Sequence, residues 1–289
     1  MASSEYTYKQ GGFEVSEQMK KDFDRDGFVI IRNLFDKEEL ENLKKNIENE
    51  DGGLREMAFN QDDGGGLNLT MIQWTHPGTD VSGIIARSKK VVGISEQLLG
   101  GEVYQYCATI NMKEAHSGGQ HLWHQDYGYW YKNGLLFPDM ANMLLAVDKA
   151  DKSNGCLQVL RGSHLAGRVD HKRMAGQTAA DEERVGQLRK VLELVYLELD
   201  PGDVVFFHCN LLHRSDQNRS DHRRRAYIIL YNRASNNPAF EHYNASYTPI
   251  DIVDDMEIKT CSNHTDFTGK QFMDLVANKN ITAVRVNKD

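Results

Sequence analysis

Several features that mark particular classes of protein are scarce or missing in this chain. Its four cysteines lie far apart with no C-x-x-C pair, which argues against a disulfide framework and a zinc knuckle. The longest early apolar run, Phe28–Ile31, is far too short for a signal sequence or a membrane span. There is also no internal repeat and no low-complexity segment. The sequence therefore reads as an ordinary globular protein.

An excess of positive charge is missing as well. The chain has 34 basic and 42 acidic residues and a net charge of -8, so it is a poor partner for nucleic acid or anionic lipid. The N-terminus has no arginine-rich pattern, and Asn287–Asp289 is no peroxisomal tripeptide. We therefore expect a cytoplasmic protein that acts on a small molecule, without nucleic-acid or membrane partners. The oligomeric state stays open between monomer and homodimer.

The composition of the chain is sufficient for one large hydrophobic core, since 40% of the 289 residues are hydrophobic and 26% are charged. We interpret residues 1–15 as a flexible N-terminal segment and residues 16–289 as a single domain. Residues 16–100 should be mainly helical, with helices over 16–25, after the capping residue Asp36, and over 88–99. A strand is expected at Phe28–Ile31 between the first two helices.

After residue 100 short apolar runs separated by turn signals predict strands. They lie at 103–112, 143–147, 156–160, 192–199, 204–207 and 226–231, with a helical insert at 180–190. This pattern is typical of a sandwich or barrel. We predict a mainly β fold with flanking helices and a double-stranded β-helix (jelly-roll) core over about residues 101–235. A C-terminal extension, 236–289, should include a helix around 270–276.

Three glycines in Gln61–Gly66 do not form a phosphate-binding loop, because no G-x-x-x-x-G-K-[ST] motif follows and no strong strand precedes them. A mobile loop near a site is the better interpretation. We expect a lid over the site from residues 51–80 and from about 165–180.

Two histidines and one aspartate form a candidate metal site. His124 and Asp126 are two residues apart, so an extended backbone would turn both to one side, and His213 follows 89 residues after His124. Two imidazoles and one carboxylate make a facial triad, which suits Fe(II) and leaves coordination positions for substrates. An H-x-D pair is common by chance, so ordinary polar residues remain an alternative for this motif alone.

Arg224 strengthens the interpretation, because it starts a predicted strand 11 residues after His213. A buried guanidinium matches a carboxylate in a bidentate way, as a dicarboxylate ligand requires. Side-chain alternation turns only Arg224 of the run Arg223–Arg225 to one side, so we expect its two neighbours to be solvated.

A set of motifs in fixed order resembles the phytanoyl-CoA dioxygenase superfamily of Fe(II)/2-oxoglutarate oxygenases over roughly residues 20–235. The motifs are W-H-Q-D at 123–126, N-G-C-L at 154–157, G-S-H at 162–164, P-G-D at 201–203, and His213 with Arg224. Within the superfamily the chain is most similar to ectoine hydroxylases and L-proline trans-4-hydroxylase-like proteins, which share the runs His124–Trp130 and Asn154–His164.

The resemblance implies roles for individual residues. Iron(II) would be bound by His124, Asp126 and His213. The cosubstrate 2-oxoglutarate would contact Arg224 and Ser215 through its distal carboxylate and would also meet Asn111 and Gln105. Trp130 matches a substrate-lining tryptophan, and further candidates for substrate contact are Tyr127, His121 and Arg161.

The resemblance also implies the reaction. 2-Oxoglutarate and O2 would become succinate and CO2 while an unactivated C–H bond is hydroxylated, with ascorbate as a possible reductant. His121, Cys107 and Thr109 stand where ectoine hydroxylases have an aromatic residue, a glutamine and an arginine. We therefore favour a free amino or imino acid such as L-proline as the substrate.

Other functions stay open. The same chemistry could act on an ectoine-like compound or on an acyl-CoA, although an acyl-CoA would usually need a basic entrance. A non-catalytic ligand-binding jelly roll is an alternative of another class. A zinc hydrolase could use the same triad, but no general base can be placed for it.

Overall fold

The computed structural model describes residues 4–9, 11, 13–240, 246–275 and 283–286. Its α-helices are α1 (Glu17–Asp26), α2 (Lys37–Glu48), α3 (Val81–Arg87), α4 (Lys89–Leu99), α5 (Tyr127–Trp130), α6 (Glu182–Leu188) and α7 (Glu257–Thr260). Its strands are β1 (Glu5–Thr7), β2 (Phe28–Arg32), β3 (Phe59–Asp62), β4 (Asn68–Thr75), β5 (Val103–Lys113), β6 (His121–His124), β7 (Met140–Ala146), β8 (Leu157–Leu160), β9 (His171–Met174), β10 (Gln177–Ala180), β11 (Leu194–Leu197), β12 (Val204–His208), β13 (His213–Ser215), β14 (Arg224–Arg233), β15 (Gln271–Phe272) and β16 (Ala283–Arg285).

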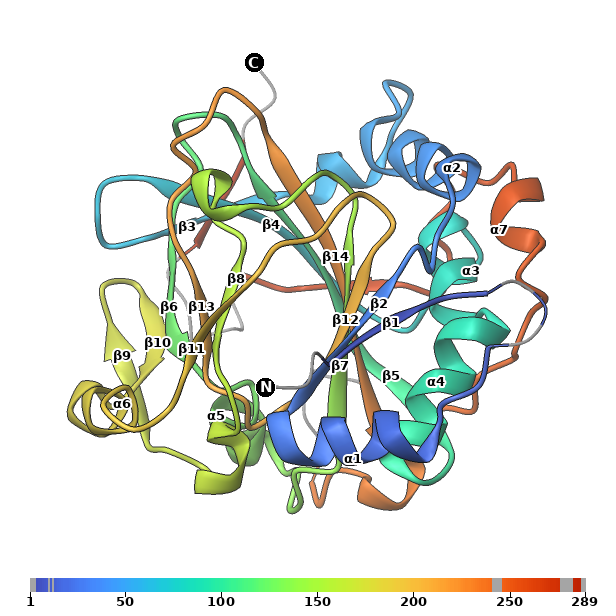
Figure 1. Ribbon diagram of the computed structural model, residues 1–289. Coiled ribbons are helices and arrows are strands. Elements are labelled where there is room, and N and C mark those ends of the chain that lie inside the picture. The colour runs from blue at the N-terminus through green and yellow to red at the C-terminus, as the bar shows by residue number, and fades with distance from the viewer. Residues whose placement is uncertain (1–3, 10, 12, 241–245, 276–282, 287–289) are drawn as a thin grey trace.

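Two sheets face each other and form the core of the fold (Figure 1). The larger sheet has the strand order β1-β2-β12-β7-β14-β5-β4-β3-β16, and β15 pairs with β4. The smaller sheet has the order β11-β8-β13-β6. Helices α2, α3, α4 and α7 lie on the outer side of the larger sheet, at the right of Figure 1. The predicted mainly β fold with flanking helices is confirmed.

Side-chain alternation gives the larger sheet two distinct faces. On β14, Tyr227, Ile229 and Tyr231 pack in the main core cluster on the helix side. Ile228 and Leu230 alternate with them and line a cavity between the sheets. Strands β7 and β12 are buried on both faces in the same way. The larger sheet is thus a rigid base for any group that points from it into the cavity.

The predicted helix ends are confirmed where capping chemistry marks them. The Ser16 side chain accepts a hydrogen bond from the Met19 amide at the start of α1, and Asp36 forms a capping box with Glu39 at the start of α2. Helix α4 ends at Gly100 in the left-handed conformation. The helical insert is α6, and each of the six predicted strand regions after residue 100 contains a strand.

The prediction of a flexible segment over residues 1–15 is wrong for residues 5–7. They form β1, which pairs in parallel with β2 and extends the larger sheet. Ser4 is buried and its hydroxyl hydrogen-bonds Asp26, while Val15 belongs to the main core. Polar composition misled the prediction, because a short edge strand needs few apolar side chains of its own.

Two further expectations need correction. The loop expected at Gln61–Gly66 is wrong at its start, because Gln61 and Asp62 belong to β3, and the region 51–80 from which we expect a lid contains β3, β4 and a short 3-10 helix, Leu54–Met57. The predicted C-terminal helix is wrong for residues 270–275, where β15 pairs with the end of β4, and Val276 lies outside the described residues. Because strands from both ends of the chain complete one sheet, we propose that the chain forms a single domain.

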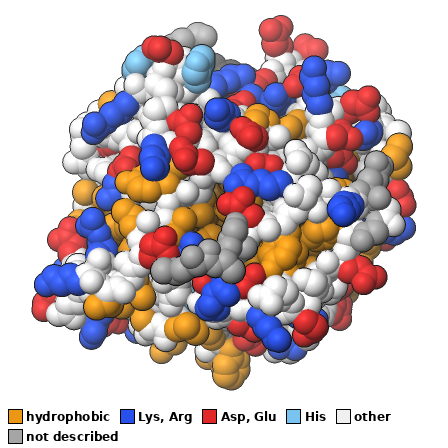
Figure 2. Space-filling view, viewed as in Figure 1, with side chains coloured by type: hydrophobic (Ala, Val, Ile, Leu, Met, Phe, Trp, Pro, Cys, Tyr) orange, Lys and Arg blue, Asp and Glu red, His pale blue; other side chains and the backbone are white. Residues whose placement is uncertain are grey.

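The face of the molecule seen in Figure 2 carries interspersed acidic and basic side chains, with apolar side chains gathered near its middle. Within the described part of the chain, no helix has the length and apolar character needed to cross a membrane.

Candidate active site

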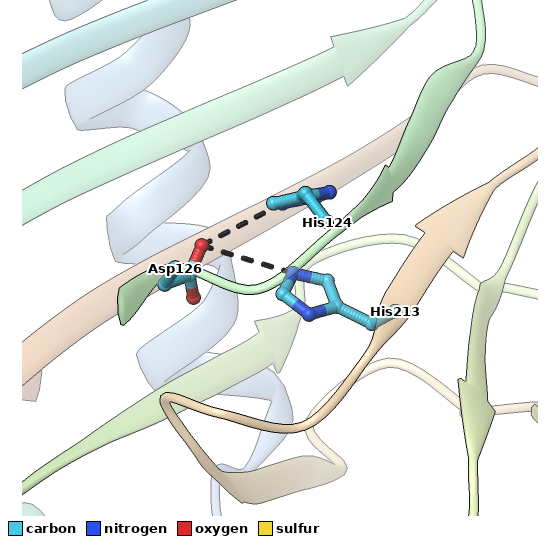
Figure 3. Close-up of side chains that lie close together, drawn as sticks. All are labelled: His124, Asp126 and His213. Carbon is cyan, nitrogen blue, oxygen red and sulfur yellow. Dashed lines mark ion pairs between the residues drawn. The ribbon is translucent and has the colours of Figure 1, made fainter. Parts of the chain in front are cut away.

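The predicted triad assembles between the two sheets. His124 ends β6, Asp126 precedes α5, and His213 begins β13, so the three come from neighbouring segments of the smaller sheet (Figure 3). Asp126 Oδ1 lies 3.5 Å from His124 Nε2 and 3.8 Å from His213 Nε2. One ligand atom from each residue lies within 4.8 Å of the others. This spacing allows one ion to bind all three.

Hydrogen bonds orient each member of the triad. The Nδ1 atoms of His124 and His213 lie 2.7 and 2.9 Å from the carbonyl oxygens of Leu122 and Leu211. Since a carbonyl oxygen only accepts, each Nδ1 must donate, which leaves each Nε2 lone pair free for a metal. Asn142 Nδ2 donates to Asp126 Oδ2 over 2.7 Å and so leaves Oδ1 turned to the histidines.

The protonation states at neutral pH suit metal binding. Burial, and then the neighbouring His124, lower the pKa of His213 to about 4. Burial raises the pKa of Asp126, but His213, His124 and the hydrogen bond from Asn142 outweigh it, and the pKa lies below its usual value. A neutral His213 and an ionised Asp126 are the forms that coordinate a divalent ion.

The backbone conformation that brings His124 and Asp126 together differs from the predicted extended one. Asp126 is helical (φ -64, ψ -38) and begins the turn of α5, so the segment is not extended throughout. Gln125 between them is fully buried, and its backbone N–H donates to His171 Nε2 over 2.9 Å. His171 Nδ1 in turn lies 2.7 Å from the Val169 carbonyl oxygen. A buried network therefore holds the H-x-D turn.

Arg224 lies at the other end of the cavity, on the face of β14 that points inward. It is 6% exposed; Nη2 donates to the Gly155 carbonyl oxygen over 2.7 Å, and Nε has no partner among the described residues. Burial lowers its pKa to about 10, so it stays charged at neutral pH. Ser215 and Asn111 line the same cavity, and the Asn111 Oδ1 atom is buried without a described partner. This end of the cavity is suited to a carboxylate.

The cavity has a volume of about 150 Å³. Trp130 and His121, both predicted, line it, and the His121 ring lies 4.1 Å from the His124 ring centroid. Burial, followed by the positive charges of neighbouring groups, lowers the pKa of His121 well below its usual value.

Three predicted site residues lie outside the cavity. A bulge in β5 pairs Leu230 with Cys107 but Tyr231 with Gln105, so Gln105 turns to the opposite face of the sheet. Tyr127 packs in the core, with its hydroxyl 3.2 Å from the Leu135 carbonyl oxygen.

Arg161 is the third. It forms ion pairs with Asp26 and Glu193 at 2.7 and 2.9 Å, so its guanidinium is engaged in structural contacts. The expectation of two solvated neighbours for Arg224 is also wrong in part. Arg225 is 3% exposed and makes a bidentate ion pair with Asp148, because its face of β14 meets acidic side chains.

Several polar or aromatic residues that line the cavity were not predicted as site residues, among them Gln61, Gln73, Asn133, Asn142, Phe207 and Arg214. The strands β3 and β4 that carry the two glutamines were not predicted. Tyr129 lies in the aromatic run that drew attention to Trp130, and its hydroxyl donates to the Thr178 carbonyl oxygen over 2.6 Å.

The residues present fit iron(II) and 2-oxoglutarate. Two free imidazole nitrogens and a carboxylate on one side of an ion leave further coordination positions open, as non-heme iron oxygenases need. The partnerless Nε of Arg224 offers the second donor that a bidentate carboxylate contact requires.

Comparisons with known proteins agree with this geometry. The model of the family phytanoyl-CoA dioxygenase (PhyH) matches residues 23–226. The L-proline trans-4-hydroxylase of Streptomyces griseoviridis is 30% identical over 233 residues, which are 75% of this chain and 86% of that protein. The ectoine dioxygenase of Bordetella parapertussis is 28% identical over 79% of this chain and 80% of its own length.

A solved structure shares the fold. EctD from S. alaskensis with 2-oxoglutarate and 5-hydroxyectoine superposes with a TM-score of 0.68 and 21% identity. The match covers 86% of this chain and 90% of that one.

Proposed function

Because this chain belongs to the phytanoyl-CoA dioxygenase family and is a 2-oxoglutarate-dependent dioxygenase, we propose that it hydroxylates a free amino or imino acid, with L-proline as the leading candidate. The observation that carries the proposal is the pairing of a complete triad and a buried Arg224 with 30% identity to an L-proline trans-4-hydroxylase.

Each predicted residue then has a task. His124, Asp126 and His213 would hold the iron, while Arg224 and Ser215 would bind the distal carboxylate of 2-oxoglutarate and so orient it. When bound, iron and 2-oxoglutarate together supply O2 activation, with succinate and CO2 as coproducts of the hydroxylation. Tyr129 and Trp130 form an aromatic wall that limits the access of water to the reacting C–H bond. Ascorbate would serve only as an external reductant.

An ectoine-like substrate is the second candidate, because the ectoine dioxygenase of Bordetella parapertussis is 28% identical. An acyl-CoA is disfavoured, since its several phosphate charges would need basic partners and the chain carries a net charge of -8.

The test is succinate release by anaerobically iron-loaded protein, supplied with 2-oxoglutarate and air, across free amino acids including L-proline and also ectoine. We expect one amino or imino acid to stimulate release, Asp126→Ala to abolish it, and the exposed control Asp51→Ala to retain it. Stimulation by ectoine or an acyl-CoA alone would refute the substrate assignment. Iron-loaded protein that releases no succinate under any condition would favour the non-catalytic binding protein.

A further inference from the structure

One wall of the cavity carries none of the residues that we assign to iron or to 2-oxoglutarate. It comes from β3 and β4, which lie on the far side of β5 from β14, the strand that carries Arg224. Gln61 and Gln73 line the cavity from this wall, and Gln73 stands opposite Thr109 of β5 in the sheet register. The wall therefore lies beside the residues that would hold 2-oxoglutarate, where a second ligand could contact it.

Both glutamine side chains line the cavity. Gln61 is 2% exposed and lines the cavity from β3. Gln73 reaches the Cys107 thiol, where its hydrogen bond opposes the effect of burial on the thiol pKa. A buried amide carries two N–H donors and one carbonyl acceptor, and leaving them without partners costs free energy. The wall is therefore suited to a ligand that both donates and accepts hydrogen bonds.

The charges around the cavity balance once the cosubstrate is bound. Iron(II) and the Arg224 guanidinium together match the two carboxylates of 2-oxoglutarate and the one of Asp126. Arg214, the other arginine at the cavity, is ion-paired with Asp216. Lys113 donates to the Asp216 carbonyl oxygen and is not among the residues that line the cavity. Among the described lining residues no further charge remains to neutralise a ligand. A substrate of one net charge would therefore be desolvated without compensation, which is costly.

We propose that Gln61 and Gln73 are the substrate-recognition residues and that they select a compact, net-neutral zwitterion over monovalent acids and amines. The amide N–H groups donate to the substrate carboxylate, and the amide oxygens accept from its primary or secondary ammonium N–H. The faces of Tyr129 and Trp130 complete the site for the cationic end. This inference rests on the proposed function and narrows it, because it specifies the net charge of the substrate and names the residues that recognise it.

The experiment uses three compounds with one ring size and different charges: L-proline, pyrrolidine and cyclopentanecarboxylate. Their binding to protein loaded with iron(II) and 2-oxoglutarate is measured anaerobically by calorimetry, and their stimulation of succinate release is measured in air. We expect L-proline, or another zwitterion of the amino-acid panel, to bind at least about 10-fold more tightly than the two monovalent compounds. Equal or tighter binding of either one would overturn the inference while leaving the hydroxylase intact.

The variants Gln61→Leu and Gln73→Leu keep the side-chain volume close and remove the amide. Each should raise KM and Kd for the zwitterion about 10- to 100-fold, since hydrogen bonds to a charged group are lost. The Kd for 2-oxoglutarate and the visible absorption of the iron–cosubstrate complex should not change. Gln97→Leu, at an exposed glutamine on α4, is the matched control.

The possible failures can be told apart. An unchanged substrate KM in both variants would overturn the inference, as would a loss of 2-oxoglutarate binding that equals the loss of substrate binding. Absence of binding by any zwitterion, with succinate release stimulated by another class of compound, would overturn both the inference and the proposed function. Thermal midpoints equal to that of the parent protein show that the variants are folded.

Discussion

Asn142 on β7 gives the sharpest test of how the metal site is built. Its side chain is fully buried, and Nδ2 donates to Asp126 Oδ2 over 2.7 Å. This bond fixes the rotation of the carboxylate so that Oδ1 faces both histidines at 3.5 and 3.8 Å. Asn142→Leu keeps the volume and removes the donor, so the carboxylate can rotate away from the position in which it binds metal.

The size of the effect follows from the contact. A hydrogen bond to a charged group contributes about 1.5–3 kcal/mol. At about 1.4 kcal/mol per factor of ten, its loss weakens iron binding about 10- to 100-fold. Groups that orient metal ligands commonly have effects of this size. Asn142→Asp adds a second carboxyl group beside Asp126, and the pair would then share a proton. Iron binding in that variant should therefore show a new pH dependence that Asn142→Leu lacks.

The measurement is anaerobic iron(II) affinity by competition with a chelator, with Asn68→Leu, at an exposed asparagine of β4, as the control. The thermal midpoint of metal-free protein separates a folding defect from a metal-site defect. Iron affinity in Asn142→Leu within twofold of the parent value, in folded protein, would refute the positioning role of Asn142.

Three further predictions concern the cosubstrate, acid stability and a buried ion pair. Arg224→Gln should weaken 2-oxoglutarate binding by about 2–5 kcal/mol, and Arg224→Lys by less, because a lysine keeps the charge but loses the bidentate contact; calorimetry measures both. Burial lowers the pKa of His208 to about 4, so the unfolded chain binds the proton first, and the free energy of unfolding should fall as the pH drops from about 6.5 to 4. His208→Gln should flatten that slope in urea titrations, and an unchanged slope would contradict the assignment. Lys270 and Asp80 form an ion pair at 2.8 Å with both side chains fully buried, so Lys270→Met should cost about 3–5 kcal/mol in urea unfolding, whereas replacing both partners with apolar residues should restore much of the loss.

The parts of the site that the sequence predicted are those that short motifs encode. His124 and Asp126 are two positions apart and His213 begins the strand beside β6, so the smaller sheet brings all three together. Arg224 was placed by its spacing from His213, by alternation and by the family resemblance, and its strand does point it into the cavity. Capping residues such as Asp36 located the helices for the same reason, since the signal lies within four residues.

The parts that were mispredicted depend on contacts distant in sequence. Alternation fails at Gln105 because the bulge in β5 inserts one residue, and nothing in the local composition marks a bulge. Arg225 was expected in solvent because its partner Asp148 lies on a different segment, just after β7. Gln61 was missed because β3 contains only one residue that favours strands, Phe59, and its neighbours in the sheet stabilise it. Gln73 was missed although β4 does contain strand-favouring residues, because its place beside β5 depends on a pairing distant in sequence.

The wall formed by β3 and β4 also has a consequence for the order in which the protein is made. Strand β3 receives its outer neighbour from β16, and the end of β4 receives β15, so both partners are among the last described residues that a ribosome adds. The triad and Arg224 are complete earlier, because β14 ends at Arg233, whereas β15 begins at Gln271 and β16 at Ala283. During synthesis the iron-binding centre can therefore assemble while the wall that we assign to substrate recognition still lacks its edge. A chain shortened so that it lacks β16 but keeps Lys270 and its partner Asp80 should accordingly retain metal and lose its discrimination between substrates.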